Sequence, residues 1–486
     1  MTALDTLMDQ GQRIAGHRPW PRAVVDRSCW LDASILVSDG AATMLGLWSD
    51  GEQVHMALGA PNLAGPVIVS LDCPDRRYPS VAAQHAPAMR LERTIRDLHG
   101  LQPVDLPDER PWLRHVPNYP FLPVEGESLH QIPVGPVHAG IIEPGHFRFT
   151  ALGETIVRLE ERLGYTHKGT EALMRGADLT KGARLAARVS GDSTVAYGWC
   201  FASAVEAAFG ATAPARAVHL RALMAELERL ANHLGDIGAV CNDCSFALMH
   251  AHCGALRESV LRASAAAFGH RLMMDRILPG GVAADLDGDG TKAIRALLAE
   301  IGAKFPTLIR IYDSTASLED RTVGSGTLAL ALATTFGAGG FIGRASGRRV
   351  DARVQPGYAP YDKLTFDVPV LTTGDVDAQV RIRIAEVQQS LRLIEQLLAT
   401  MPQGPIAIEL PLSNAIAEGV ALVEGFRGDI LVWVRIGADG RIVHCHLRDP
   451  SWFQWPLLEA AIEGNIVADF PLCNKSFNCS YSGQDL

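Results

Sequence analysis

The sequence has no excess of basic side chains and no recognisable export segment. Its 486 residues include 44 Lys and Arg against 54 Asp and Glu, a formal net charge of −10. Binding to nucleic-acid phosphates needs a basic surface, so this balance argues against a nucleic-acid partner. The first ten residues carry acidic side chains and no basic segment followed by an apolar run. We therefore expect no signal peptide and a cytoplasmic location.

Long apolar runs are also missing. The longest uncharged stretch, residues 322–343, contains six glycines and several Ser and Thr residues. Such a stretch is too weakly apolar to favour a lipid-spanning helix, and we expect a buried, tightly packed segment instead. The glycine-rich residues 337–340 are not followed by Lys-Ser or Lys-Thr and have no G-x-G-x-x-G frame. We therefore expect this chain to bind no NADH itself.

Cysteine is scarce and unevenly spaced. Nine cysteines in a chain without an export signal predict reduced thiols and no disulfide framework. Cys241 and Cys244, with His250, His252 and Cys253 beyond them, superficially have the spacing of zinc ligands. On a helix the last three would spread over different faces, and cysteine is a common small core residue. We therefore expect core packing here and no metal.

The N-terminal part has the patterns of a small α/β domain. Short β-like runs occur at residues 33–38 and 67–71, separated by Gly, Asp and Pro turn signals. Residues 78–100 have apolar side chains at helical spacing and a stop signal at Gly100. Eight prolines between residues 103 and 136 indicate an extended, packed linker.

The rest of the chain has strand, helix and again strand patterns. Residues 134–169 alternate apolar and polar side chains around a Gly153-Glu154 turn, which predicts two antiparallel strands. Residues 216–234 have one continuous apolar helical face. Further helical patterns cover residues 173–190, 196–209, 248–274, 290–311 and 376–398, and residues 429–447 form a strand hairpin pattern. We predict an α+β fold with a small N-terminal α/β domain, a central helical bundle and peripheral β-structure.

Several motifs then occur in an order that is known from one family. They are Gly135-Pro-Val-His138, Glu143-Pro-Gly-His-Phe-Arg148, His167-Lys-Gly-Thr-Glu171, Arg216 with Glu226-Leu-Glu-Arg-Leu-Ala-Asn-His233, Arg321-Thr-Val-Gly324, Arg344-Ala-Ser-Gly347, Arg427-Gly-Asp429 and Gly464-Asn-Ile-Val-Ala-Asp469. Together they resemble the large subunit of energy-converting nickel-iron hydrogenases of the formate hydrogenlyase and hydrogenase-4 type. They also resemble its relative, the quinone-site large subunit of respiratory complex I.

The resemblance implies a division of the chain into domains. Residues 134–486 are expected to form a nickel-iron-hydrogenase-large-subunit-like domain, also similar to the complex I 49-kDa subunit. The motif Glu92-Arg-Thr-Ile-Arg-Asp-Leu-His-Gly100 makes residues 1–115 similar to the complex I 30-kDa subunit. A Pro-rich linker at residues 116–133 joins the two.

The departures from the family concern its metal ligands. Hydrogenases of this kind hold nickel and iron through four thiolates, from R-x-C-G-x-C and D-P-C-x-x-C motifs. The corresponding positions here are Ser190, Ser193, Ser480 and Gly483. A serine hydroxyl is a hard ligand that stays protonated near neutral pH, so we expect no nickel-iron centre. The nearby thiols of Cys473 and Cys479 lie at one end of the chain and cannot replace a four-thiolate cage.

The match to complex I is also partial. Its quinone-binding large subunit uses a Tyr just after an R-x-D motif, at the position of Gly191 in this chain. It also uses a His in the first loop, at the position of Ile142. A complex I type quinone site is therefore doubtful in detail, and quinone stays only a candidate acceptor.

The resemblance also implies site residues. Glu143 and His146 are expected to relay protons and Arg427 to hold an anion or polarise a substrate. Residues expected to contact a substrate are His138, Arg188, Ser190, Asp192, Ser193, Ser480 and Asp485. The alternatives are structural: a buried Glu143 in a Pro-Gly loop, or an ion pair of Arg427 with Asp429 or Asp485.

One predicted helix carries a cluster of charged side chains. Glu226, Glu228, Arg229 and His233 lie at spacings that allow a buried polar relay. The alternative is a solvated or salt-bridged helix surface.

The functional prediction follows from the resemblance. It implies that the chain is a peripheral-arm subunit of a membrane-bound, complex I related oxidoreductase. The subunit is expected to lie on the cytoplasmic side of the cell membrane and to take part in electron transfer coupled to ion translocation. The expected partners are a small subunit carrying an iron-sulfur cluster and the membrane subunits of a complex I-like arm. An active hydrogenase large subunit and a non-catalytic scaffold stay open as alternatives.

Overall fold

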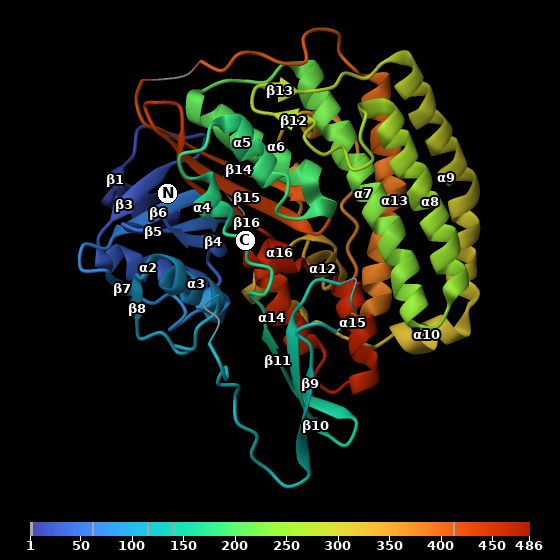
Figure 1. Cartoon of the computed structure of the whole chain (residues 1–486), viewed down its shortest axis with the longest axis horizontal. Helices are drawn as coiled ribbons and strands as arrows, with labels where there is room; N and C mark the ends of the chain where they lie inside the picture. Colours follow the sequence, from blue (N-terminus) through green and yellow to red (C-terminus); the bar gives the residue numbers. More distant parts are fainter. Residues whose placement is uncertain (1–2, 61–62, 114–115, 139, 141, 412–413) are drawn as a thin grey trace.

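The computed structural model describes residues 3–60, 63–113, 116–138, 140, 142–411 and 414–486. Figure 1 shows an N-terminal β-region on one side, a bundle of long helices on the opposite side and a β-extension below. The α+β class predicted from the sequence is confirmed. Among the described residues no helix is long and apolar enough to cross a membrane.

The N-terminal region is built on a sheet with five strands in the order β1-β3-β6-β5-β4. Its elements are α1 (Ala3–Gln10), β1 (Gln12–Arg13), β2 (His17–Arg18), β3 (Arg22–Val25), α2 (Arg27–Ser38), β4 (Thr43–Ser49), β5 (Gln53–Gly59), β6 (Val67–Asp72), β7 (Arg77–Pro79), α3 (Met89–His99) and β8 (Gln102–Val104). The strand expected at residues 67–71 is confirmed. The helix expected over residues 78–100 is confirmed only for Met89–His99, where it stops at Gly100, because Arg77–Pro79 form β7.

The strand expected at residues 33–38 is wrong, because these residues form the second half of α2. The Asp26 side chain accepts a hydrogen bond from the Cys29 N–H and so starts a helix. Trp30, Ala33 and Val37 then form its buried face, at a spacing that a strand does not produce.

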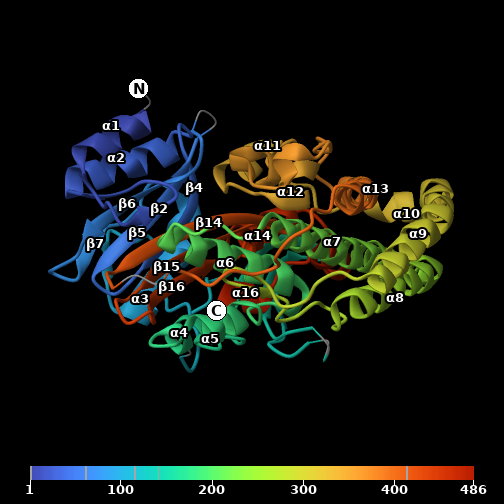
Figure 2. The same ribbon diagram turned by 90° about the horizontal axis from the view of Figure 1, so that it is seen from above.

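Two sheets pack face to face in this half of the molecule. Alternate side chains of β6 enter two apolar clusters, Val69 with Trp30 of α2 and Ile68 with Trp433 of a second sheet. That second sheet has the order β16-β15-β14-β2, from β14 (Ala417–Gly425), β15 (Gly428–Ile436) and β16 (Ile442–Arg448). Figure 2 shows the resulting layers, from α1 and α2 through both sheets to α6 (Thr194–Phe209). Because both faces are covered, most strand residues are buried.

The bundle consists of α7 (Ala215–Asp243), α8 (Ala247–Phe268), α9 (Gly288–Ser314) and α13 (Val376–Ala399). The apolar face predicted on residues 216–234 is confirmed, since all five of its leucines are completely buried. They are Leu220, Leu223, Leu227, Leu230 and Leu234.

Short elements connect the bundle to the sheets. They are α4 (Thr170–Met174), α5 (Leu179–Ala186), β12 (Ile277–Leu278), β13 (Gly281–Val282), α10 (Ala316–Thr322), α11 (Leu330–Thr335), α12 (Gly340–Ala345), α14 (Ser451–Ala461), α15 (Phe470–Phe477) and α16 (Tyr481–Asp485). The buried segment expected at residues 322–343 is only half right. Val323 and Leu330 are 53% and 50% exposed, whereas α12 is buried. Glycines at positive φ break this stretch into short helices that cannot all enter the core.

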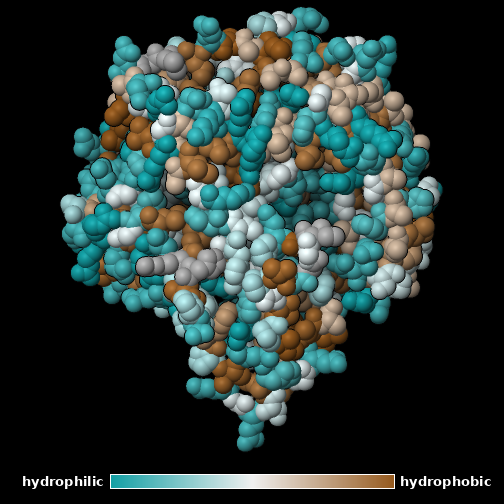
Figure 3. Space-filling view, in the orientation of Figure 1, coloured by the Kyte–Doolittle hydropathy of each residue, from teal (hydrophilic) through white to brown (hydrophobic). Residues whose placement is uncertain are grey.

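The β-extension confirms the predicted hairpin around Gly153. Strands β10 (His146–Leu152) and β11 (Thr155–Arg162) pair antiparallel, and β9 (Leu129–Val134) adds a third strand. Figure 3 shows apolar and polar surface interspersed over this tapering end, where Leu152 and Val157 are exposed.

Candidate functional site

Two loops from distant parts of the chain meet at the centre of the molecule. One joins α5 to α6 and carries Ser190 and the short turn η2 (Gly191–Ser193). The other joins α15 to α16, with Ser480 as the N-cap of α16. The Ser480 hydroxyl donates to Ser190 Oγ at 3.0 Å, and Ser190 donates to Asp192 Oδ1 at 2.8 Å. The two halves of the family's metal motif are therefore in direct contact.

Arg427 enters this centre from the two-residue turn between β14 and β15. The strands close at the Gly425 and Gly428 pair, and Gly428 has φ +136°, which only glycine adopts without strain. The guanidinium binds Asp192 through two bonds, at 2.7 Å to Oδ1 and 2.5 Å to Oδ2. A bidentate ion pair fixes the orientation of both side chains.

The partner of Arg427 corrects both alternatives that the sequence left open. Asp429 is paired with Arg448, and Asp485 accepts hydrogen bonds from Gly164 and Thr166. The acid that Arg427 binds is Asp192.

The ion pair is charged near neutral pH. Burial raises the pKa of Asp192, but the charge of Arg427 and hydrogen bonds from both Arg427 and Ser190 lower it by more, so its pKa lies below its ordinary value. The Arg427 side chain is 5% exposed and that of Asp192 is 35% exposed. Solvent reaches the carboxylate from one side.

The four family ligand positions gather around this pair. Arg427 Nη1 donates to Ser193 Oγ at 3.3 Å, and the Gly483 N–H donates to Ser480 Oγ at 2.9 Å. A side-chain carbon on Gly483 would lie only 2.5 Å from Asp449 Oδ2. The donors present are hydroxyls, a guanidinium lies among them, and the fourth position is sterically closed. None of the four positions therefore offers the soft, ionised sulfur that a bridged nickel and iron require.

Glu143 and His138 lie at the outer edge of this centre. Glu143 is exposed, contrary to the buried carboxylate that was the alternative, and accepts a hydrogen bond from the Ser482 N–H at 3.1 Å. The His138 ring packs against Phe147 and Tyr481 with centroids 5.6 and 6.3 Å apart. Both side chains therefore contact α16, whose N-cap is Ser480.

Three other predicted site residues have their contacts elsewhere. His146 packs against Phe121, with ring centroids 4.9 Å apart, and is buried in the β-extension. Arg188 forms a surface ion pair with Asp275 at 2.6 Å. Asp485 accepts from the Thr166 hydroxyl at 2.7 Å, which ties down the last helix. No described contact joins any of these three side chains to Arg427.

The charged cluster on α7 divides between two faces. Glu228 accepts hydrogen bonds from the Val195 and Ala196 N–H groups, at 2.7 and 3.1 Å, and so caps the start of α6 beside Asp192. On another face His233 binds Glu386 at 2.7 Å. The solvated alternative is wrong, because every charged member of the cluster is buried.

The second face of α7 belongs to a network of buried ion pairs. Its positive side chains are Arg229, Arg344 and Arg353, and its negative ones are Glu226, Asp351, Glu386 and Glu424. All seven side chains are at most 2% exposed. A buried relay of this kind was one of the two sequence interpretations.

A small cavity of about 190 Å³ adjoins Asp192 on the side of α7 and α8. Its lining includes Glu228, Asn232, Ser264 and Arg271. The Ser264 hydroxyl is buried without a hydrogen-bond partner among the described residues. Most of the remaining lining is apolar, from α7, α8 and the segment after α8, and Asp192 of the ion pair is one of its polar residues.

Glu228 makes stability depend on pH. Burial raises its pKa from 4.5 to about 8, against the opposing effect of its two backbone hydrogen bonds. The folded chain then holds a proton that the unfolded chain releases above about pH 4.5. Stability relative to Glu228→Gln should fall as pH rises from about 4.5 to 8, by up to about 1.4 kcal/mol per pH unit. Urea unfolding of both proteins between pH 5 and 8.5 measures this, with the exposed Glu395→Gln as control. Parallel curves for wild type and Glu228→Gln would contradict it.

Asp449 and Tyr197 are site residues that the sequence interpretation missed. Tyr197 donates to Asp449 Oδ2 at 2.7 Å, and Asp449 Oδ1 accepts from the Ser451 N–H at 2.8 Å. The sequence does contain a signal, since Asp449-Pro450 stands directly before a helix. That signal indicates a helix start and says nothing of the contact with Gly483.

The cysteine cluster is core, as expected. Cys241, Cys244 and Cys253 are buried, whereas His250 and His252 are exposed. Among the described residues no group of three or more potential ligands is placed to hold a metal ion.

Comparison with known proteins then decides the family. Residues 243–417 match the family model of the respiratory-chain NADH dehydrogenase 49 Kd subunit. The chain is 31% identical over 452 residues to formate hydrogenlyase subunit 5 of Escherichia coli, covering 86% of this chain and 79% of that protein. The chain belongs to the family of hydrogenase and complex I large subunits.

Other members of this large-subunit family show both of its branches. The chain is 29% identical to an NADH-quinone oxidoreductase subunit of Roseiflexus sp., covering 70% of this chain and 94% of that protein. It is 28% identical to the membrane-bound hydrogenase subunit alpha of Pyrococcus furiosus, covering 73% of this chain and 87% of that protein. The resemblance stated from motifs is therefore confirmed.

Proposed function

We propose that this family member is a peripheral-arm subunit of a membrane-bound oxidoreductase and that it holds no nickel-iron centre. The observation that carries the proposal is the bidentate Arg427–Asp192 ion pair, at 2.7 and 2.5 Å, among the former ligand positions. A bridged nickel and iron need ionised sulfur, and Ser190 and Ser480 supply hydroxyls that hydrogen-bond each other instead.

The proposed assembly follows from the relatives. One is named a membrane-bound hydrogenase subunit and another belongs to NADH-quinone oxidoreductase. We propose that the chain packs against a small subunit with an iron-sulfur cluster, on the cytoplasmic side of the membrane and above membrane subunits. It would then take part in electron transfer coupled to ion translocation.

The acceptor proposal concerns the cavity beside Asp192. Its volume of about 190 Å³ suits one small ring and leaves no room for a long tail. Arg427 holds Asp192 from behind and does not line the cavity, whose guanidinium groups are Arg257 and Arg271. Those two groups can attract an oxygen with developing negative charge, and Glu228, whose pKa is about 8, holds a proton that can be transferred. These groups suit a quinone-like headgroup. A complex I type pairing of Tyr and His is not part of the proposal, since Gly191 and Ile142 stand there.

The first test is metal analysis of the purified assembled complex with a hydrogen-uptake assay on an artificial dye. We expect well below one nickel per copy of this chain, no hydrogen uptake, and iron and sulfide only at the level of partner clusters. About one nickel per chain with hydrogen uptake would overturn the proposal and establish an active hydrogenase.

A scaffold role is the second candidate, because the donors at the centre are already satisfied by one another. In that case Arg427→Met would leave electron transfer by the assembled complex intact. The surface variant Arg188→Met is the matched control, since it removes an ion pair outside the centre.

A further inference from the structure

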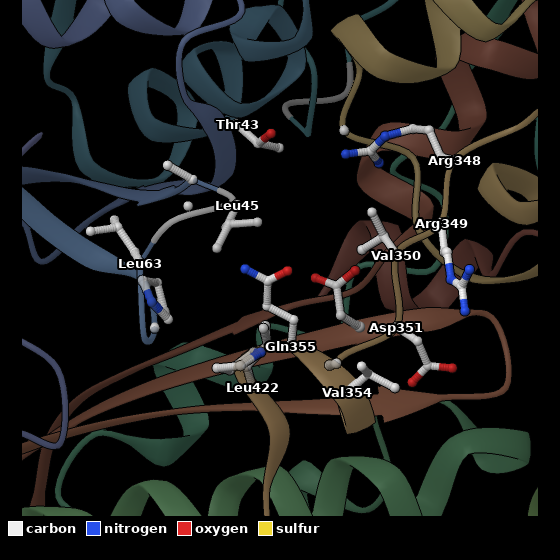
Figure 4. A pocket seen from close by; sticks show the side chains of 18 of the residues that line it. Thr43, Leu45, Leu63, Arg348, Arg349, Val350, Asp351, Val354, Gln355 and Leu422 are labelled. Carbon is white, nitrogen blue, oxygen red and sulfur yellow. The ribbon is translucent and has the colours of Figure 1, made fainter. Parts of the chain in front are cut away.

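A cavity of about 540 Å³ lies away from the candidate site, between the N-terminal sheet and the segment after α12. Figure 4 shows Thr43, Leu45 and Leu63 on one side, Arg348, Val350 and Val354 on the other, and Gln355 between them. Ligand-binding cavities commonly have volumes of about 300 to 1,000 Å³. This one is large enough for a small organic molecule.

The walls of the cavity are held in place by buried interactions. Strand β2 pairs with β14, so the N-terminal segment shares a sheet with the C-terminal one. Arg22 pairs with Glu418 at 2.9 Å, and Arg435 pairs with Asp50 at 2.6 Å across the same boundary. The cavity is therefore part of the fold and does not depend on a loose contact between domains.

Most of the lining is aliphatic or aromatic. The apolar lining residues include Leu45, Leu63, Val350, Val354, Phe366 and Leu422. An apolar surface of this kind favours hydrocarbon by about 25 cal/mol for each Å² that is covered.

Arg348 and Arg349 are the cations in the lining, and Arg348 is the one whose guanidinium extends into this apolar space. Its guanidinium extends across the cavity toward Thr43 in Figure 4, and one N–H donates to the Ala338 carbonyl. The two acids in the lining are already paired, Asp351 with Arg353 at 2.7 Å and Asp429 with Arg448. Among the described residues no carboxylate forms an ion pair with Arg348. A partly buried guanidinium without a counter-ion favours an anion from solution.

We propose that this cavity binds a small amphiphilic anion, with a carboxylate or phosphate monoester on Arg348 and an alkyl body along Leu45, Leu63 and Val354. The site is independent of the proposed redox function, because the cavity shares none of the residues of the Arg427–Asp192 centre. The anionic head group of the ligand supplies the counter-ion that Arg348 lacks. Its alkyl body covers apolar cavity surface that water otherwise contacts.

The test is calorimetric binding of dodecanoate and dodecyl phosphate to the full chain, below their micelle concentrations, with dodecanol as the uncharged probe of equal chain length. We expect saturable 1:1 binding of at least one anion, at least tenfold tighter than dodecanol. If only one anion binds, that result identifies the head group. Equal affinity for dodecanol, or no saturable binding of either anion, would overturn the proposal.

Two variants and one matched control locate the site. Arg348→Gln should reduce anion affinity to the level of dodecanol, whereas Leu45→Trp should abolish binding of all three probes by filling the cavity. Arg349→Gln is the control, because this second arginine of the lining is exposed and its guanidinium points away from the cavity in Figure 4. Equal losses in Arg348→Gln and Arg349→Gln would show a nonspecific charge effect and overturn the assignment.

Discussion

Replacing Arg344 by methionine is expected to lower the free energy of unfolding by about 3–5 kcal/mol. Arg344 is completely buried and contacts Glu386 at 2.6 Å, Glu424 at 2.9 Å and Asp351 at 3.5 Å. Methionine fills much of the volume but supplies no charge. The three acids then keep only Arg229, Arg353 and His233 as positive or ionisable neighbours, and buried charge without a partner is costly.

Urea unfolding measures this loss, with Arg349→Met as the control. Arg349 is the exposed neighbour in the same segment, so its loss should change stability by less than about 0.5 kcal/mol. A second variant, Arg344→Met with Glu424→Gln, should recover part of the loss. Burial and the charge of Asp351 raise the pKa of Glu424 to about 7, so its charge is the least favourable in the network. A loss below about 1 kcal/mol in Arg344→Met would contradict this account.

Replacing Gly483 by alanine is expected to destabilise the chain by about 1–3 kcal/mol. The new methyl group would meet Asp449 Oδ2 at 2.5 Å and Ser480 Oγ at 2.9 Å. Asp449 is 1% exposed and held by Tyr197 and the Ser451 N–H, so it cannot swing away without losing buried hydrogen bonds.

Gly254→Ala is the matched control for this prediction. Both glycines lie in helices without positive φ, but a methyl group on Gly254 meets nothing within 4 Å. That substitution should stabilise the chain by about 0.5–1 kcal/mol, because alanine is the better helix former. If Gly483→Ala is equally stabilising, the fourth ligand position is open, and the steric argument against a thiolate there fails.

The Arg344 network and the Arg427–Asp192 centre differ in their access to solvent, and this difference bears on function. The Arg344 network is sealed from water, whereas Asp192 in the centre is 35% exposed on its side chain and adjoins a cavity. Solvent screening weakens an exposed ion pair, so an anionic ligand can compete for Arg427, and a proton for Asp192, far more easily than for the members of the Arg344 network. This accessibility favours the Arg427 centre as the place where the chain acts.

Local patterns predicted the elements well where one side of the element is buried. The leucines of α7 and the alternation around Gly153 repeat at the period of the helix and of the strand, and both elements are confirmed. Residues 33–38 gave a wrong prediction because a run of Ile, Leu and Val is compatible with either a strand or a helix. The Asp26 cap decides between them, and it lies seven residues before the run itself.

The sequence by itself determined the family and the loss of the thiols, since motif order and residue identity need no coordinates. The family motifs also predicted that Ser190, Asp192 and Ser480 reach the centre, but they placed His146, Arg188 and Asp485 there as well, whose contacts lie elsewhere. Only the tertiary structure decided that Arg427 pairs with Asp192, 235 residues away, rather than with nearby Asp429. The physical reason is that periodicity and capping act over a few residues, whereas the partner of a buried charge depends on which distant loops the core packing brings together.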